Sequence, residues 1–512
     1  MSVKRVLVIA GSDSSGGAGL EADQRVLAAH GCYALTATTG LTAQNTLGVQ
    51  DIFVVPPEFV RKQLVASLED VGADVVKLGM LSSAETIDVI AETLQVHRVP
   101  SIVLDPVMVS TSGSQLLPEK AVKELRTKLL PMTTILTPNI PEAQLLIKDS
   151  GAEVPEPVDL NGSIQLARQI CSLGPKAVLL KGGHLPLTKD HKTAKAPQEA
   201  TTVMDVLYDG ETDTTTLFET EYLVSKNTHG TGCSLASAIA ANLAMGNGMV
   251  RAVRSAVRFV EAGIKTSVNL GQGSGPINHF HSIYTMPFAP GRFVEYILDR
   301  PDVQRVWWKF THHEFVEGLG QGTLPVERFK EYLVQDYLYL VQFARSNALA
   351  SYKSRSMDSI AASARIVLHI QREMALHLDY CASFGLSKEE IEAHQETLAC
   401  TAYSRYILDV GQSEDWLALQ MALAPCLIGY GAIARRLYSE AQTLREGNQF
   451  WKWIENYVAE DYTEAVRLGS ALLEEHMQKV SPSRMEELIG IFIRATELEI
   501  NFWDMGLSDK KM

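Results

Sequence analysis

The chain has 512 residues, of which 46% are hydrophobic and 21% charged, and a formal net charge of −14. This length predicts two or more domains of ordinary globular composition, because a single hydrophobic core does not grow so large. The acidic balance and the lack of a dense Lys/Arg run exclude a typical nucleic-acid-binding chain.

The apolar segments and the cysteines bear on the cellular compartment. No uninterrupted apolar stretch is long enough to span a bilayer, and the first apolar run, Val6–Ala10, is too short for a signal peptide. The six cysteines form no C-x-x-C pair, which argues against a zinc site or a disulfide framework. We therefore expect a cytoplasmic protein with neither a membrane nor a nucleic-acid partner.

The first half of the chain alternates short buried strands with helical segments. The first strand, Val6–Ala10, leads into a Gly/Ser-rich loop, Gly11–Gly19, and a helix from about Leu20; the loop lacks the G-x-G-x-x-G pattern of Rossmann dinucleotide sites. Further buried strands are predicted over Tyr33–Thr38, Val75–Leu78, Ile102–Leu104, Thr134–Leu136 and Ala177–Leu180. This alternation predicts an α/β domain with a mainly parallel sheet and helices on both faces.

Polar residues and glycines follow each predicted strand. In chain order they are Gly11 and Asp13, Gln44 and Asn45, Gly79 and Met80, Asp105 to Met108, Thr137 to Asn139, and Lys181 to His184. Open parallel sheets bind ligands beyond the carboxyl ends of their strands. Six such ends at one edge therefore predict a ligand site rather than turns alone. The polar segment 185–202 that follows is expected to be a mobile surface loop, and a role as a lid stays open.

The segment His229-Gly230-Thr231-Gly232-Cys233 precedes small and apolar residues that predict a buried helix. Glycines let the backbone approach a ligand, and the free N–H groups at a helix start bind phosphate. The same helix end is expected to lower the pKa of the Cys233 thiol. Without further context, the segment is equally consistent with a turn before a core helix, in which Cys233 only packs.

Together these stretches resemble the hydroxymethylpyrimidine and phosphomethylpyrimidine kinases of thiamine synthesis, within the ribokinase-like fold. The matching stretches are AGSDSSGGAGLEAD (Ala10–Asp23), LTAQNTLGV (Leu41–Val49), VKLGML (Val76–Leu81), LDPVMVSTSG (Leu104–Gly113), TPNIPEA (Thr137–Ala143), LLKGGH (Leu179–His184) and HGTGCSLASAIAA (His229–Ala241). They follow the order of the family, so we place a kinase domain at residues 1–282.

The resemblance implies roles for individual residues and implies ATP and Mg²⁺ as cofactors. Gln44 would pair through its amide with the ring nitrogen and amino group of the pyrimidine, and Cys233 would take the proton of the substrate hydroxyl. The residues that would shape the pyrimidine pocket are Gly11, Ala18, Asp23, Met80 and Val107. The residues that would bind ATP and the transferred phosphate are Lys181, Gly230, Thr231 and Gly232.

A metal role is implied for Asn139 and Glu142, whose N-x-x-E pattern organises Mg²⁺ and its waters in this superfamily. The same spacing fits an ordinary helix cap followed by an acidic residue in the first helical turn. Both interpretations stay open at this point.

The second half begins after a glycine- and proline-rich region. Gly271–Pro276 and Pro287–Gly291 interrupt the helical pattern, so we place the boundary near Ser282 and a second domain at residues 290–512. Beyond the boundary β-branched runs disappear and amphipathic helices predominate, which predicts an all-α helical bundle.

Three predicted helices of this half carry reactive side chains on apolar faces. Asp336 lies in the middle of one apolar stripe, and Glu499 lies at the centre of another. Glu497 is about 200° around the same helix and should face outward. Cys426 follows a proline expected to start a helix and lies one turn from Tyr430. Because a buried acid is costly unless it is paired or used, the set predicts a site.

This half resembles the TenA family of thiaminases II over about residues 295–507. The matching stretches are VQDYLYL (Val334–Leu340), TAYSRYIL (Thr401–Leu408), ALAPCLIGY (Ala422–Tyr430), WKWIENYV (Trp451–Val458) and ELEINFWDM (Glu497–Met505). The resemblance implies that Cys426 is a nucleophile, that Glu499 donates a proton to the leaving group, and that Asp336 binds the aminopyrimidine. The tyrosines that would line the pocket are Tyr339, Tyr403, Tyr430 and Tyr457.

We therefore expect a fused bifunctional enzyme of thiamine pyrimidine salvage that forms a homo-oligomer. One half would hydrolyse thiamine or aminopyrimidine breakdown products, and the other would phosphorylate the resulting hydroxymethylpyrimidine twice. Two alternatives stay open: a pyridoxal-type kinase on the same fold, and a helical half that only binds or oligomerises. The preferred hydrolase substrate and any transfer of intermediate between sites also stay open.

Overall fold

The computed structural model describes residues 3–108, 117–190 and 192–508. The chain folds into two compact units, Met1–Ile283 and Tyr284–Met512, each of which is described by itself. The part of the LDPVMVSTSG stretch from Val109 to Gly113 lies outside the described residues.

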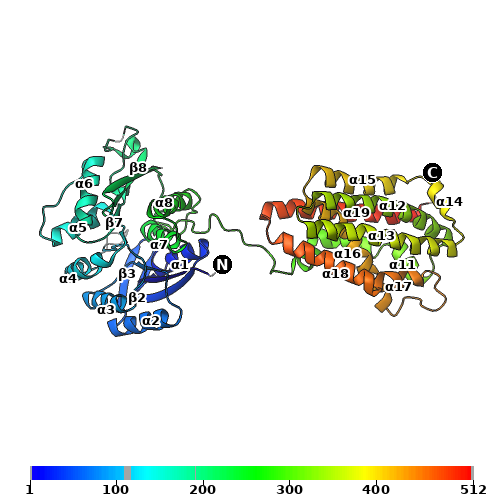
Figure 1. Ribbon diagram of the computed structural model, residues 1–512, viewed down its shortest axis with the longest axis horizontal. Coiled ribbons are helices and arrows are strands. Elements are labelled where there is room, and N and C mark those ends of the chain that lie inside the picture. The colour runs from blue at the N-terminus through cyan, green and yellow to red at the C-terminus, as the bar shows by residue number, and fades with distance from the viewer. Residues whose placement is uncertain (1–2, 109–116, 191, 509–512) are drawn as a thin grey trace. The chain divides into compact units, whose positions relative to one another are not determined.

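The described part of the first unit contains one sheet of nine strands in the order β3-β2-β1-β4-β5-β6-β7-β8-β9 (Figure 1). The strands are β1 (Arg5–Asp13), β2 (Tyr33–Asn45), β3 (Gly48–Val54), β4 (Val75–Leu78), β5 (Ile102–Leu104), β6 (Ile135–Leu136), β7 (Ala177–Leu180), β8 (Thr202–Asp209) and β9 (Thr214–Glu221). Six neighbouring strands pair in parallel, in the order β2, β1, β4, β5, β6 and β7. The other three pair antiparallel: β3 with β2 at one end of the sheet, and β8 with β7 and β9 at the other. The predicted mainly parallel sheet is confirmed.

Two strands extend several residues beyond their predicted ends. β1 continues to Asp13 after a register shift, and β2 continues to Asn45, so Gln44 lies within a strand instead of following one. The cause is β3, which pairs with the second half of β2 and was missed because most of its side chains are exposed or half-buried. β9 was missed for a similar reason, because it is a Thr-rich edge strand with one buried residue. In β8 buried and half-buried residues are mixed, and only Val206 and Leu207 are buried in succession.

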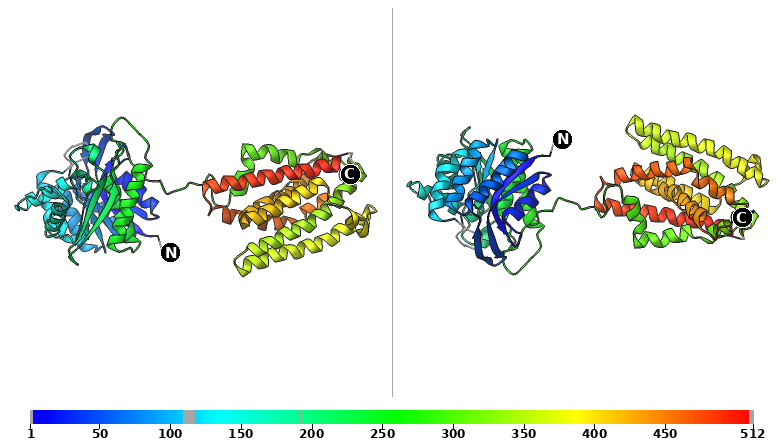
Figure 2. Two further views of the ribbon diagram at one scale, coloured as in Figure 1. Left: turned by 90° about the horizontal axis from the view of Figure 1, so that it is seen from above. Right: turned by 90° about the horizontal axis from the view of Figure 1, so that it is seen from below.

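Helices cover both faces of the sheet (Figures 1 and 2). Val6 and Val8 of β1 pack in a core with α1, α7 and α8, whereas Leu7 and Ile9 pack in a second core with α2 to α6. This alternation is the period of two expected of a strand buried on both faces. The helices are α1 (Gly19–Ala29), α2 (Pro57–Asp70), α3 (Ala84–Val96), α4 (Glu119–Glu124), α5 (Ile140–Asp149), α6 (Leu160–Cys171), α7 (Thr231–Ala244) and α8 (Met249–Lys265), with a π-turn η1 (Leu125–Leu129) and short 3₁₀ turns η2 (Leu130–Met132), η3 (Gly182–His184) and η4 (Pro197–Glu199).

Two segments without predicted helix or strand, Gly271–Pro276 and the expected mobile loop 185–202, are held by backbone hydrogen bonds. Ser274 N donates to Thr46 O at 2.9 Å and His229 N donates to Gly275 O at 3.0 Å, so Gly271–Pro276 is packed onto the first unit. In the segment 185–202, Leu187 is buried and its N–H donates to Thr202 O at 2.8 Å. The described part of that segment is therefore attached to the start of β8.

The second unit is all helical, as predicted (Figure 1). Its helices are α9 (Phe293–Asp299), α10 (Pro301–Thr311), α11 (Glu314–Gln321), α12 (Val326–Lys353), α13 (Met357–Ser383), α14 (Lys388–Ala393), α15 (Leu398–Ser413), α16 (Trp416–Ser439), α17 (Trp451–Val458), α18 (Glu460–Met477) and α19 (Pro482–Leu507). One core rich in aromatic side chains is built from these helices.

Helix α16 corrects one prediction and qualifies another. Pro425 does not start a helix but lies inside α16, because the apolar side chains on both sides of it are buried and hold the helix together across the missing backbone donor. By length and composition alone, α16 is also the helix among the described residues that could cross a membrane, yet most of its apolar stretch is buried in this core.

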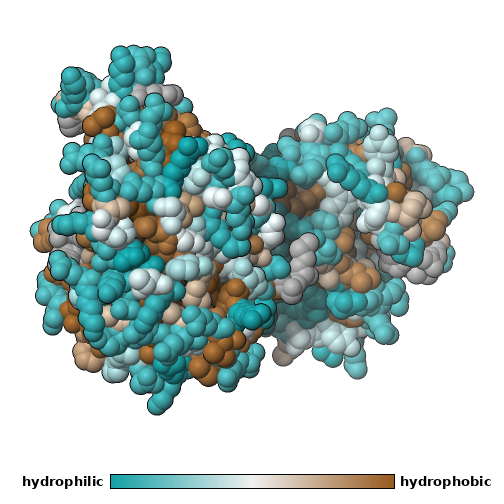
Figure 3. All heavy atoms as spheres, turned by 60° about the vertical axis from the view of Figure 1, so that its left-hand side comes forward, coloured by the Kyte–Doolittle hydropathy of each residue, from teal (hydrophilic) through white to brown (hydrophobic). Residues whose placement is uncertain are grey.

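The face of the molecule drawn in Figure 3 is mostly hydrophilic, with scattered apolar side chains.

Candidate active sites

A cleft of about 930 Å³ opens at the carboxyl ends of the parallel strands of the first unit. Side chains and backbone from all six predicted strand ends meet there, together with the start of α7. The predicted site residues that line the cleft are Gly11, Ala18, Gln44, Met80, Val107, Asn139, Glu142, Lys181, Gly230, Thr231, Gly232 and Cys233. The structure therefore brings together residues that are more than 200 positions apart, such as Gly11 and Cys233.

Asp23 is the predicted pocket residue that the structure places elsewhere. It does not line the cleft but is fully buried behind it, where its carboxylate contacts Lys77 Nζ at 2.8 and 2.9 Å and accepts a hydrogen bond from Ser237 Oγ at 2.7 Å. Lys77 does line the cleft. Any effect of Asp23 on a ligand is thus expected to pass through the Lys77 ammonium.

Met80 fills a slot that only glycines leave open. A Cβ atom added to Gly11 would lie 2.2 Å from Met80 Cε, and one added to Gly40 would lie 3.4 Å from the same atom. The two glycines therefore let the Met80 side chain lie against strands β1 and β2 at the wall of the cleft.

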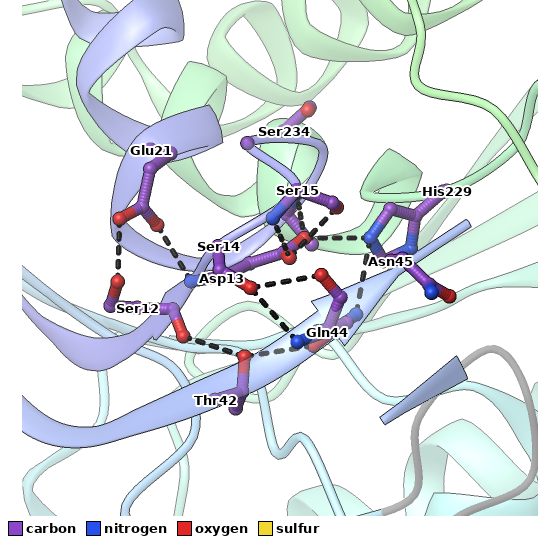
Figure 4. Close-up of polar contacts among 12 residues, drawn as sticks. Ser12, Asp13, Ser14, Ser15, Glu21, Thr42, Gln44, Asn45, His229 and Ser234 are labelled. Atoms are coloured by element: carbon purple, nitrogen blue, oxygen red, sulfur yellow. Dashed lines mark hydrogen bonds and ion pairs between the residues drawn. The ribbon is translucent and has the colours of Figure 1, made fainter. Parts of the chain in front are cut away.

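Polar residues of β1, β2 and the turn before α7 form a network beside this wall (Figure 4). Asp13 Oδ2 lies 2.7 Å from His229 Nε2, and the same ring nitrogen lies 3.3 Å from Gln44 Nε2. Thr42 Oγ1 lies 3.2 Å from Gln44 Oε1. The amide of Gln44 thus enters the cleft with protein groups on both sides.

The Asp13 carboxylate is anchored from several directions. It accepts hydrogen bonds from Ser15 N at 2.9 Å, Ser15 Oγ at 2.8 Å and Ala18 N at 2.9 Å, besides its contact with His229. Burial raises the pKa of Asp13, but the hydrogen bonds from His229 and Ser15 outweigh it and bring the pKa to about 2. Asp13 is therefore ionised at neutral pH.

The start of α7 has the geometry of an anion site. Gly230 caps the helix in the left-handed conformation at φ 78°, and a Cβ on it would lie 1.9 Å from Gly17 O. A Cβ on Gly232 would lie 3.3 Å from Lys181 Nζ and 3.5 Å from Asp105 Oδ2. The Lys181 ammonium thus lies beside the free N–H groups of the first helical turn, where both favour a phosphate.

The expectation of a lowered pKa for Cys233 is wrong. Burial raises the pKa of the thiol to about 11; Lys77 lowers it, whereas the carboxylates of Asp23 and Asp105 raise it further. A hydrogen bond from the Gly19 backbone also lowers it, but not enough. Desolvation and two nearby anions therefore outweigh the favourable helix start at this position.

Asn139 and Glu142 form the helix cap that the sequence also allowed. Glu142 N donates to Asn139 Oδ1 at 2.9 Å, and Asn139 N donates to Glu142 Oε2 at 2.8 Å, which is a capping box at the start of α5. The Glu142 carboxylate has a further contact besides the cap, because it lies 3.7 Å from Lys181 Nζ. Lys181 Nζ in turn contacts Asp105 Oδ1 at 2.8 Å. Burial raises the pKa of Glu142 to about 7; Lys181 opposes this rise and Asp105 adds to it.

This donor set fits a cation held largely through water. Among the described residues there is no cluster of three or more His, Cys, Asp or Glu side chains that could enclose a metal ion. Mg²⁺ keeps most of its waters in nucleotide enzymes and takes one or two carboxylates. Glu142 and Asp105 are oxygen donors whose mutual repulsion a divalent cation would relieve.

Three titratable residues of this site were not assigned a role from sequence. Lys77 interrupts the apolar strand β4, Asp105 ends β5, and His229 precedes the two glycines of α7. A lysine within a short buried strand was the available signal, because a buried ammonium needs a partner. The partner, Asp23, lies 54 positions away and could not be read from spacing.

A second cluster of reactive side chains lies inside the bundle of the second unit. Glu499 on α19 is buried, and Tyr403 OH on α15 donates to its Oε1 at 2.7 Å. Burial raises the pKa of Glu499 to about 8 against the effect of this hydrogen bond. Glu497 instead pairs with Arg494 at 2.8 Å on the surface, so the predicted inward and outward faces of these two acids are confirmed.

The other predicted residues of this cluster are also buried or half-buried. Asp336 on α12 lies 3.8 Å from His377 on α13; burial raises its pKa to about 6 and His377 opposes this. Burial and the nearby Glu499 raise the pKa of Cys426 well above that of a free thiol.

Aromatic side chains surround these groups. The rings of Tyr339 and Tyr403 stack at 4.9 Å, and those of Tyr430 and Tyr457 lie 5.2 Å apart. The cluster combines a thiol, two acids and flat aromatic walls, which suits a flat heterocyclic ligand.

Both halves of the chain match described protein families. A family model described as phosphomethylpyrimidine kinase matches residues 13–278, and one described as TENA/THI-4/PQQC family matches residues 300–509. A Schizosaccharomyces pombe protein assigned as a putative hydroxymethylpyrimidine/phosphomethylpyrimidine kinase 2 is 42% identical over 499 residues, which are 97% of this chain and 90% of the relative.

Two further similarities extend the comparison. The thiamine biosynthesis multifunctional protein of Corynebacterium glutamicum is 30% identical over 551 residues, covering 99% of this chain and 67% of the relative. Among solved structures, a Bacillus subtilis pyridoxal kinase in an ADP complex is 33% identical over 55% of this chain and 98% of that chain, with a TM-score of 0.46.

Proposed function

Since the chain belongs to the phosphomethylpyrimidine kinase family and carries a second domain of the TENA/THI-4/PQQC family, we propose that it is a two-site enzyme of thiamine biosynthesis. The first domain, at residues 1–282, phosphorylates hydroxymethylpyrimidine and then its monophosphate with ATP. The second domain, at residues 290–512, releases hydroxymethylpyrimidine from aminopyrimidines derived from thiamine.

One observation carries the kinase proposal. The Gln44 amide and the start of α7 line the same cleft, so one ligand can meet a group that reads a heterocycle edge and a group that holds phosphate. In this arrangement Gln44 binds the ring, and the amides of Gly232 and Cys233 with the Lys181 ammonium stabilise the charge on the transferred phosphoryl group.

Cys233 is proposed as the base that takes the hydroxyl proton. Because its pKa is about 11, most of the thiol is protonated at neutral pH, and the Lys77 ammonium is the nearby charge that favours the thiolate. The hydroxyl oxygen then bonds to the γ-phosphorus while the bond between phosphorus and the β,γ-bridging oxygen breaks and ADP leaves. Glu142 and Asp105 would hold Mg²⁺ through water, and the bound ion would supply positive charge against the phosphates.

The hydrolase is proposed on the buried cluster of the second unit. Asp336 binds the aminopyrimidine, Cys426 adds to the pyrimidine ring, and Glu499 protonates the departing amine. Water then adds at the exocyclic methylene and Cys426 leaves, which gives hydroxymethylpyrimidine and a free amine. With a pKa of about 8, Glu499 carries the needed proton at neutral pH.

Product identification by mass spectrometry tests the kinase proposal against a pyridoxal-type kinase. The full chain is incubated with ATP, Mg²⁺ and an equimolar mixture of hydroxymethylpyrimidine, its monophosphate, pyridoxal and pyridoxine. The proposal predicts hydroxymethylpyrimidine mono- and diphosphate as the main products. Preferential formation of pyridoxal phosphate or pyridoxine phosphate would contradict the proposal and favour a pyridoxal-type kinase.

A further inference from the structure

The hydrogen-bond network around Gln44 contains a proton conflict. Thr42 Oγ1 lies 2.9 Å from Ser12 O and 3.2 Å from Gln44 Oε1, and both of these oxygens accept, yet one hydroxyl has one proton. On the other side, Gln44 Nε2 faces His229 Nε2 at 3.3 Å. These three contacts are drawn in Figure 4.

Asp13 decides where the proton of His229 lies. Its carboxylate already accepts three hydrogen bonds from Ser15 and Ala18, so it is a pure acceptor, and at 2.7 Å it requires a proton on His229 Nε2. A protonated ring nitrogen cannot accept from the Gln44 amide nitrogen. In this orientation of Gln44 two donors therefore face each other at 3.3 Å.

Turning the Gln44 amide by half a turn removes the conflict at Thr42 and the contact between two donors at His229. The oxygen and nitrogen of a carboxamide are nearly alike in shape, so the network decides their places. The amide oxygen then faces His229 Nε2–H as a second, weaker acceptor at 3.3 Å, because Asp13 accepts the same proton at 2.7 Å. The amide nitrogen donates to Thr42 Oγ1, whose own proton goes to Ser12 O. One N–H and one oxygen lone pair of Gln44 remain for a ligand.

We propose that Asp13 and His229 are positioning residues that fix the orientation of the Gln44 amide and thereby make the cleft select a heterocycle whose amino group is adjacent to a ring nitrogen. The oxygen of Gln44, on the His229 side, accepts from the amino group, and its nitrogen, on the Thr42 side, donates to the ring nitrogen. This inference rests on the proposed kinase function and names the substrate feature that the site reads.

The backbone around His229 supports a fixed position for its ring. Its N–H donates to Gly275 O at 3.0 Å, and a Cβ on Gly17 would lie 2.5 Å from His229 Cδ2. His229 is 6% exposed and Asp13 is 3% exposed. Because both partners are buried and confined, the tautomer that they enforce is transmitted to Gln44 instead of being lost to side-chain motion.

The proposal predicts a strong preference against the oxo analogue, in which a carbonyl replaces the amino group and the adjacent ring nitrogen carries a proton. This analogue reverses donor and acceptor, so the fixed amide meets it with two mismatched contacts. In the wild-type chain we expect kcat/KM for the amino substrate to exceed that for the oxo analogue by about 10²-fold or more.

Asp13→Asn is the decisive variant. The new amide can donate to His229 Nε2, which moves the imidazole proton to Nδ1 and lets Gln44 present either orientation. We expect the preference for the amino substrate to fall by at least about tenfold, mainly through KM, while kcat at saturation changes by only a few-fold. Thr42→Val removes the other anchor and is expected to lower the preference as well.

Ser15→Ala is the matched control. It removes a hydrogen bond to the same carboxylate at 2.8 Å but leaves the side that faces His229 intact, so the preference should stay as in the wild type. A second readout needs no substrate: ¹⁵N-histidine NMR of the full chain should give a protonated Nε2 for His229 in the wild type and an unprotonated Nε2 in Asp13→Asn.

Several outcomes would overturn the proposal. One is an unchanged amino-to-oxo preference in soluble Asp13→Asn and Thr42→Val; another is an unprotonated Nε2 in the wild type. An equal decrease of kcat/KM for both substrates in Asp13→Asn would show that Asp13 is a purely structural residue. Failure of the kinase function itself would look different, because the wild type would then phosphorylate neither pyrimidine while the NMR result still reported the tautomer.

Discussion

At the scale of single residues, the proposed role of Cys233 as the base predicts how the kinase depends on pH. For a base with a pKa of about 11, the reactive thiolate increases about tenfold for each pH unit below that value. We therefore expect kcat of the kinase to rise between pH 7 and pH 9. Cys233→Ala should lose ~10²–10⁴-fold in kcat and the pH dependence with it.

Cys171→Ala is the control for this variant, since Cys171 lies on α6 and outside the lining of the cleft. It should keep the wild-type rate and pH profile, and both variants should keep the hydrolase. Kinase activity of Cys233→Ala within a few-fold of wild type would contradict the role of base.

Glu499 and Glu497 form a matched pair on α19. Glu499→Gln removes the buried proton donor and should reduce hydrolase kcat by ~10²–10⁴-fold, whereas Glu497→Gln breaks only a surface pair with Arg494 and should have little effect. Because a general acid must be protonated, the wild-type rate should fall as pH rises above about 8. Equal effects of the two variants, or a rate that rises through this range, would remove Glu499 from the mechanism.

Sequence could predict which of these residues face a site, but not their ionisation. The apolar stripe of α19 was sufficient to separate Glu499 from Glu497, because helical periodicity is a local property. The pKa of Cys233 depends on Asp23 and Asp105, which are distant in the sequence and adjacent only in the fold. The Lys77–Asp23 pair and the Asp13–His229 pair were missed for the same reason.

At the scale of elements, the turn into α7 depends on the backbone of Gly230. Gly230→Ala would strain a left-handed residue and bring its Cβ to 1.9 Å from Gly17 O, which is backbone and cannot turn aside. Gly246→Ala is the control, with φ +85° but no atom within 4 Å of the added Cβ. We expect Gly246→Ala to cost about 1 kcal/mol and keep kinase activity, and Gly230→Ala to cost more and lose it.

Unfolding can be assigned to one unit by spectroscopy. All six tryptophans of the chain lie beyond residue 300, so tryptophan fluorescence reports only on the second unit. In urea, Gly230→Ala should shift the circular dichroism transition of the first unit and leave the fluorescence transition unchanged. Equal stability and activity of the two glycine variants would contradict the close approach of Gly17 and Gly230.

Elements were predictable from sequence where burial is continuous. The central strands β4, β5 and β7 coincide with their predicted ranges, because short apolar runs mark strands buried on both faces. β3 and β9 lie at the sheet edges with mostly exposed or half-buried side chains, and β8, between β7 and β9, has only two successive buried residues, so their sequences lack this signal. Pro425 shows the opposite case, in which tertiary packing keeps a helix continuous across a residue that usually interrupts one.

At the scale of the whole molecule, we propose that the two units are separable. Each has its own hydrophobic core, and the division lies between Ile283 and Tyr284. Residues 1–283 alone should keep the kinase, and residues 284–512 alone should keep the hydrolase. Absence of both activities from soluble halves, with both present in the full chain, would show that each site needs the other unit.

The most direct test of the two-site account follows one pyrimidine through the full chain. The protein is incubated with an aminopyrimidine derived from thiamine, ATP and Mg²⁺, and the products are identified by mass. We predict hydroxymethylpyrimidine diphosphate from the wild type and unphosphorylated hydroxymethylpyrimidine from Cys233→Ala. Glu499→Gln should leave the aminopyrimidine unchanged yet phosphorylate added hydroxymethylpyrimidine. If Glu499→Gln still gives the diphosphate from the aminopyrimidine, or the wild type releases no hydroxymethylpyrimidine, the account is contradicted.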